Sequence, residues 1–217
     1  GGCKNLVTGN KSSVVGGILN TASGTCSFVG GGSNNRVINQ YSSIIGGSDN
    51  LDGSQYSIIG GGQINEITLN GCCSSMVGGY NNCINNPLSF IGGGYENGIT
   101  RPLMMSTAFS FIGGGCQNQV TSSLSSIVGG YQNQLPEGSN CSFIGGGTCN
   151  IVCCNNSFIG GGCRNCVIGI KSSIVGGAFN TSSLDFSFIG GGQFNVVQDN
   201  YNSIVGKLKV SHLTYSF

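Results

Sequence analysis

The 217-residue chain has very few charged side chains. They make up 7% of its residues, where roughly 25% is usual for a soluble domain. Eight Lys and Arg stand against seven Asp and Glu, so the net charge is +1. A protein that binds nucleic acid needs a basic surface to neutralise phosphates. The composition therefore excludes a nucleic-acid partner.

Proline and long apolar runs are scarce as well. There are three Pro residues and no Gly-X-Y period, which excludes a collagen-like chain, and apolar residues at 38% are too many for a disordered one. No run of 18 or more apolar residues is present, so we expect no membrane insertion by this segment. What the chain has in abundance is glycine, at 41 residues.

The glycines belong to a short repeat, Ser-apolar-apolar-Gly. Successive anchors are 14 to 16 residues apart except for two longer spacings of 18 and 21, which indicates one small coil per unit. The anchors are Ser13, Ser27, Ser43, Ser57, Ser75, Ser89, Ser110, Ser126, Ser142, Ser157, Ser173, Ser187 and Ser203.

Two versions of the unit mostly alternate, one with two glycines and one with three. An Asn follows the anchor at seven residues in the first version and at eight in the second. Its regularity favours a structural ladder of stacked amides, with an exposed ligand-binding array as the alternative. The ladder residues are Asn20, Asn35, Asn50, Asn65, Asn82, Asn97, Asn118, Asn133, Asn150, Asn165, Asn180 and Asn195.

The consecutive glycines predict strands rather than helices, because each costs about 1 kcal/mol relative to Ala inside a helix. Short strands joined by glycine corners satisfy the pattern. We therefore predict an all-β chain, a parallel β-solenoid of about 13 coils over residues 1–206. Stacked at roughly 4.8 Å, these coils form a rod about 60 Å long.

Two apolar columns follow the anchor serines. Adjacent strand residues point to opposite faces, so we expect the smaller column, which begins Val15, Val29 and Ile45, to fill the coil. The larger column would form an exposed stripe that needs a partner of equal length, most simply two further copies in a homotrimer. The alternative is one wider coil that encloses both columns. The predicted interface column is Phe28, Ile44, Ile58, Met76, Phe90, Phe111, Ile127, Phe143, Phe158, Ile174, Phe188 and Ile204.

This repeat resembles the head repeats of trimeric autotransporter adhesins, which are left-handed parallel β-rolls wound from three chains. The resemblance covers residues 1–206 as a pattern. It implies a trimeric rod on a surface, and related Gly-Gly-x-x-Asn repeats also suit a virion fibre. The chain departs from the family in its double and triple glycines, its strict Asn column and its twelve cysteines.

The ends and the longest insertion stand outside the repeat. The chain begins within a coil, so we expect it to be part of a longer protein, and residues 207–217 are predicted to be a cap or connecting strand. The insertion offers candidates for contact with a host receptor or surface ligand. These are Arg101, Leu103, Met104, Met105 and Phe109.

Twelve cysteines favour disulfides or thiols used as apolar fillers. A zinc site is the weaker interpretation, with Cys149, Cys153, Cys163 and Cys166 as its candidate ligands. These four belong to adjacent repeats at different columns, so we predict no metal and no other cofactor.

Catalytic chemistry has little support. The one histidine, His212, lies outside the repeat, so no base is available for a Ser or Cys nucleophile. Of the seven scattered acids, only Asp52 and Glu66 fall on neighbouring repeats at nearby columns, and solvated loop positions explain them. The sequence therefore predicts a non-enzymatic, extracellular structural fibre on a cell or virion surface. The alternative is a trimeric adhesin head that binds a receptor, and a polysaccharide-active solenoid enzyme is more remote.

Overall fold

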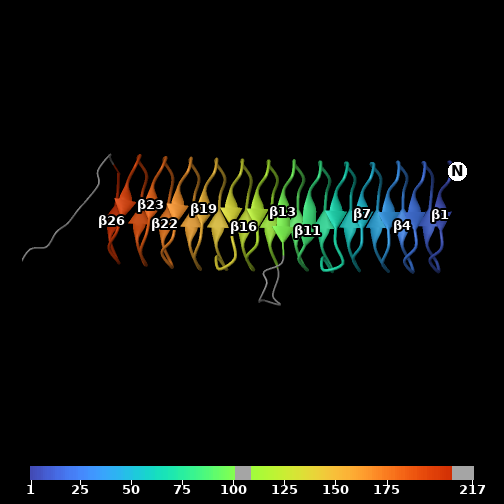
Figure 1. Cartoon of the computed structure of the whole chain (residues 1–217), viewed down its shortest axis with the longest axis horizontal. Helices are drawn as coiled ribbons and strands as arrows, with labels where there is room; N and C mark the ends of the chain where they lie inside the picture. Colours follow the sequence, from blue (N-terminus) through green and yellow to red (C-terminus); the bar gives the residue numbers. More distant parts are fainter. Residues whose placement is uncertain (101–108, 207–217) are drawn as a thin grey trace, which may run out of the picture.

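The computed structural model describes residues 1–100 and 109–206 as a straight stack of small coils (Figure 1). The described residues form 26 short strands and no helix. Odd-numbered strands make one parallel sheet of 13 strands, and even-numbered strands make a second of the same size. We call these the odd sheet and the even sheet. The predicted parallel β-solenoid of about 13 coils is confirmed.

The strands contain two or three residues each. The odd sheet contains β1 (Leu6–Val7), β3 (Thr21–Ala22), β5 (Arg36–Val37), β7 (Leu51–Asp52), β9 (Glu66–Ile67), β11 (Cys83–Asn85), β13 (Gly98–Thr100), β15 (Gln119–Val120), β17 (Gln134–Leu135), β19 (Ile151–Val152), β21 (Cys166–Val167), β23 (Thr181–Ser182) and β25 (Val196–Val197). The even sheet contains β2 (Ser13–Val14), β4 (Phe28–Val29), β6 (Ser43–Ile44), β8 (Ile58–Ile59), β10 (Ser75–Met76), β12 (Phe90–Ile91), β14 (Phe111–Ile112), β16 (Ser126–Ile127), β18 (Phe143–Ile144), β20 (Phe158–Ile159), β22 (Ser173–Ile174), β24 (Phe188–Ile189) and β26 (Ser203–Ile204).

The register of the even sheet corrects the alignment of the repeats. Ser13 lies opposite Phe28, and Phe28 lies opposite Ser43, so the anchor serines of the two versions are not equivalent. Ser27 is aligned instead with Ser12, one residue earlier. With this alignment an ordinary coil has a constant length of 15 residues, and the ladder Asn always comes eight residues after the aligned Ser.

This register also divides the predicted interface column between the two faces of the even sheet. Ile44, Met76, Ile127 and Ile174 are at most 1% exposed and belong to the core, where they cannot contact another chain. Ile204 packs partly against that core. The others lie one position earlier in the aligned coil and point outward: Phe28, Ile58, Phe90, Phe111, Phe143, Phe158 and Phe188. The prediction of a single apolar column was therefore wrong.

The column expected to fill the coil divides in the same way. Val29 is fully buried, whereas Val15 and Ile45 are 61% and 51% exposed. The core is a single layer of aliphatic side chains, one from each strand of the two sheets in most coils. The odd sheet contributes Val37, Ile67, Ile84 and their equivalents, and the even sheet contributes Ile59, Ile91, Ile112 and theirs.

Each ladder Asn is buried and connects consecutive coils. Asn118 is representative: its Nδ2 donates to the carbonyl oxygens of Gly114, in its own coil, and Gly130, in the next, both at 3.0 Å. Its Oδ1 accepts from the backbone N–H of Asn133 at 3.0 Å. The main partners are therefore backbone groups. Direct contacts between amides, such as Asn118 Nδ2 with Asn97 Oδ1 at 3.1 Å, are additional.

The glycine of the following coil whose carbonyl accepts the hydrogen bond from the Asn Nδ2 has a backbone conformation that other residues rarely adopt. In one such corner Gly47 has φ of +91°, and a Cβ there would overlap the carbonyl oxygen of Gly62 and lie 2.7 Å from Asn50 Nδ2. A Cβ on the preceding Gly46 would meet no atom within 4 Å, and the φ of Gly46 is not positive. Only the second glycine of the pair is required by the stacking.

We predict that Gly47→Ala lowers the free energy of unfolding by more than about 2 kcal/mol, because the left-handed region alone costs Ala roughly 1–2 kcal/mol. Gly46→Ala is the matched control and should stay within about 0.5 kcal/mol of the native chain. Denaturant unfolding followed by circular dichroism measures both. Equal effects of the two substitutions would contradict this assignment.

Asn118→Ala should cost about 2–4 kcal/mol, because it removes the partly buried hydrogen bonds to the Gly114 and Gly130 carbonyls and leaves the buried Asn133 N–H without this partner. The exposed Asn10 provides the control, since Asn10→Ala removes an amide from the surface. The same unfolding measurement compares them. A loss below about 1 kcal/mol for Asn118→Ala, the contribution of one ordinary hydrogen bond, would show that the ladder is dispensable.

Candidate functional surface

The outer face of the even sheet carries one large apolar side chain in every coil. It is supplied by either of two positions, the one before the core residue or the one after it. Where the first is Phe28, the second is Gly30; where the first is Ser43, the second is Ile45. This complementary choice holds in all 13 coils, so the surface has a continuous apolar stripe, which we call the even face.

The positions of the even face contain only five residue types, Ser, Phe, Ile, Val and Gly. The position before the core residue is Ser13, Phe28, Ser43, Ile58, Ser75, Phe90, Phe111, Ser126, Phe143, Phe158, Ser173, Phe188 and Ser203. The position after it is Val15, Gly30, Ile45, Gly60, Val77, Gly92, Gly113, Val128, Gly145, Gly160, Val175, Gly190 and Val205. None of these described positions bears a charge or an amide side chain.

The glycine two residues after each Phe is required mainly by the backbone of the next coil. A Cβ at Gly113 would overlap the carbonyl oxygen of Val128, and it would also lie 3.3 Å from Cε1 of Phe111, so the ring lies along the strand over the glycine. Where two Phe coils are adjacent the rings stack, with centroids 5.5 Å apart for Phe90 and Phe111 and 5.6 Å apart for Phe143 and Phe158. The face is therefore packed within itself but not covered, since Phe158 is 37% exposed.

The outer face of the odd sheet is different. The equivalent position there is occupied by residues of every kind, including Arg36, Glu66, Gln119 and Gln134. One side of the rod is thus apolar and uncharged along its length, and the opposite side is mixed. Monomeric proteins seldom leave an apolar patch of several hundred Å² uncovered, so the even face is the candidate functional surface.

The twelve cysteines are all free and lie outside the core. Among the metal candidates, the thiols of Cys153 and Cys166 form a hydrogen bond, while Cys149 Sγ donates to Gln132 Oε1 at 3.5 Å. Burial raises the pKa of Cys166 to about 11, so its thiol stays protonated at neutral pH. Over the described ranges, no group of three or more His, Cys, Asp or Glu side chains is placed to hold a metal ion.

The two neighbouring acids are not brought together. Asp52 points into the core and is 0% exposed, whereas Glu66 lies on the outer face of the odd sheet. The interpretation of Asp52 as a solvated loop residue was therefore wrong. Its Oδ1 accepts from Ser57 Oγ at 2.5 Å and from the Ser54 N–H at 3.2 Å. Burial raises the pKa of Asp52 to about 6. A pair on opposite faces of one sheet cannot act on one substrate.

The predicted receptor-contact residues belong to the longest insertion, between β13 and β14. Arg101, Leu103, Met104 and Met105 lie outside the described residues, as do His212 and the predicted cap at 207–217. Phe109 is described and is 56% exposed at the end of the insertion.

Comparison with known proteins adds no family. No protein-family model matches the chain, and no curated protein matches it. A search of the described residues finds no helix with the length and apolar character needed to cross a membrane.

The buried carboxyl of Asp52 makes stability depend on pH. Its pKa is about 6 in the folded chain and about 3.9 when unfolded, so the folded state binds the proton more tightly. Binding of this proton therefore adds roughly 3 kcal/mol to the free energy of unfolding below about pH 4, and this stabilisation is lost as pH rises through about 6. We expect Asp52→Asn to remove this component, which unfolding curves of both chains from pH 4 to 7.5 would show. Parallel pH profiles would contradict it.

Proposed function

We propose that this chain is a non-enzymatic structural protein, a rigid rod that associates with copies of itself through the even face. The homotrimer expected from the sequence is the assembly we propose, in a fibre or shaft on a cell or virion surface. The single observation that carries the proposal is the uncharged apolar stripe, renewed in every coil from Val15 to Val205. The resemblance to trimeric adhesin heads leads to the same assembly.

A second copy of the chain suits this face better than an unrelated partner. The apolar side chain moves between two positions from coil to coil, leaving Ser or Gly at the other, so the surface has projections and hollows at the coil period. A partner must present the same period of roughly 4.8 Å over the whole length. Another copy of the chain has this period because its coils are the same, and cyclic symmetry closes the assembly.

The size of the face is compatible with a specific interface. Thirteen coils give a length of about 60 Å, and two positions along a strand give a width of roughly 10 Å with their side chains, or about 600 Å² for each chain. Two such faces bury about 1,200 Å², which is the lower end of the range for specific complexes. The absence of charge on the described positions of this face removes the desolvation cost that ionised groups would impose.

The test is the native mass of the chain in solution. We expect light scattering to give three times 22.1 kDa, or an open polymer. Val175→Lys should dissociate the assembly, because each copy would then bury an unpaired charge. Thr181→Lys is the matched control: it lies in the same coil on the odd sheet and should leave the mass unchanged. A native chain of 22.1 kDa, or equal behaviour of the two variants, would refute self-association through this face.

A further inference from the structure

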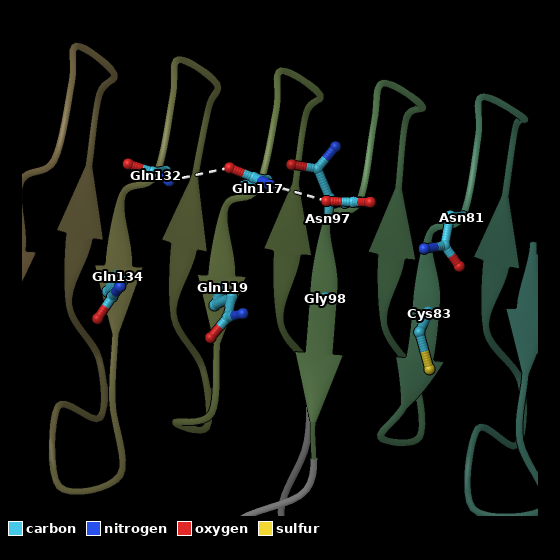
Figure 2. Close-up of a pocket in the computed structure, with 9 residues that line it drawn as sticks. Asn81, Cys83, Asn97, Gly98, Gln117, Gln119, Gln132 and Gln134 are labelled. Atoms are coloured by element: carbon cyan, nitrogen blue, oxygen red, sulfur yellow. Dashed lines mark hydrogen bonds between the residues drawn. The ribbon is translucent and has the colours of Figure 1, made fainter.

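A polar groove of about 540 Å³ crosses the outer face of the odd sheet between β11 and β17 (Figure 2). Two rows of side chains line it. One row contains Glu96, Gln117 and Gln132, from the residue before each ladder Asn. The other follows the ladder Asn and contains Gly98, Gln119 and Gln134, as Figure 2 shows along the strands. Its depth arises at Gly98, where a Cβ would have no neighbour within 4 Å.

The first row is held in one orientation by its own hydrogen bonds. Gln132 Nε2 donates to Gln117 Oε1 at 2.9 Å, and Gln117 Nε2 donates to Glu96 Oε2 at 2.8 Å. Hydrogen bonds from Gln117, then Tyr95 and Asn81, lower the pKa of Glu96, so the row ends in a carboxylate. Preorganised polar groups of this kind lose little entropy when a ligand binds.

The second row is open to a ligand. Within the described part of the chain, the exposed amides of Gln119 and Gln134 have no hydrogen-bond partner. Each offers two donors and an acceptor with two lone pairs. The sequence Gln-Asn-Gln occurs at 117–119 and again at 132–134, one coil later. The groove thus presents the same pair of amides twice, at a spacing of roughly 4.8 Å along the rod.

We propose that this groove binds an extended, neutral, β-linked oligosaccharide that lies along the rod axis. Sugar hydroxyls both donate and accept, as the amides do, and the rise per residue of such a glycan is close to the coil spacing. The lining contains no basic side chain, and Glu96 repels anions, which disfavours phosphates and acidic glycans. The groove lies on the sheet opposite the even face, so the proposal does not depend on self-association.

A peptide suits the groove less well. Peptides bind along sheets mainly by pairing with free backbone groups at an edge, whereas here the backbone of β13 and β15 already bonds to neighbouring coils, as Gly98 N–H does to Asn118 O at 2.9 Å. Apolar side chains that anchor peptides need a pocket, and the lining residues are predominantly polar. Recognition must therefore come from side-chain amides.

The test is titration of the whole chain with cellohexaose and chitohexaose, followed by calorimetry or by amide NMR shifts. We expect saturable binding of at least one of them. Gly98→Leu should weaken it at least tenfold, about 1.4 kcal/mol, because the new side chain fills the groove without backbone strain. Thr181→Leu adds the same side chain at the equivalent position outside the groove and should bind as the native chain does.

A second variant keeps the test independent of Gly98. The double substitution Gln119→Ala with Gln134→Ala removes two exposed amides and should weaken binding by a similar factor, with an unchanged circular dichroism spectrum. Failure of the native chain to bind either hexasaccharide, or native affinity in both variants, would overturn the proposal. So would tighter binding of polygalacturonate, or of a neutral Ser-Gly peptide that Gly98→Leu abolishes, since the groove would then select an acidic glycan or a peptide.

Discussion

The structure depends on the hydrogen bonds between each buried Asn and the glycine corners of two coils. The Asn118 amide needs both the Gly114 and the Gly130 carbonyl within reach, and a corner residue with a Cβ would occupy the space that the amide and the next coil fill. Six residues separate every even strand from the following odd strand for this reason. The amide at once closes its own corner and sets the position of the coil above it, which a purely apolar contact would not do.

With the Asn edge fixed by these hydrogen bonds, few constraints remain on the rest of the coil. Each strand must supply one inward residue to a core a single layer thick, and both outer faces remain free to vary. On the even face, these variable positions form an apolar surface, in which most coils have either a Phe before the core residue or a Val after it. On the odd face, they provide Glu96, the paired glutamines and the open space at Gly98. Two surfaces with different chemistry can therefore be carried by one backbone without interfering.

Much of the architecture could be predicted from the sequence, because glycine corners, an apolar column and a regular Asn are strong periodic signals. The register could not, since doublets such as Ser12-Ser13 let the pattern align on either Ser and only strand pairing distinguishes them. The burial of Asp52 could not be predicted for a different reason: the other residues of its column are mostly aliphatic, but an acidic side chain is ordinarily solvated. Nothing local marks the left-handed conformation of Ile64, whose φ is +58°. The groove could not be predicted either, because the effect of Gly98 depends on side chains from neighbouring coils.

The two edges of the rod differ in their tolerance of length. Extra residues enter the coil only between an odd strand and the following even strand, in the connections from β9 to β10, β13 to β14 and β17 to β18. The larger described loops accordingly project from one edge in Figure 1. The three connections leave every second strand of the odd sheet, at points roughly 10 Å apart along the axis. Insertions, whether they arise by evolution or by grafting, can therefore accumulate along one edge of the rod, while the Asn edge keeps the spacing of the coils constant.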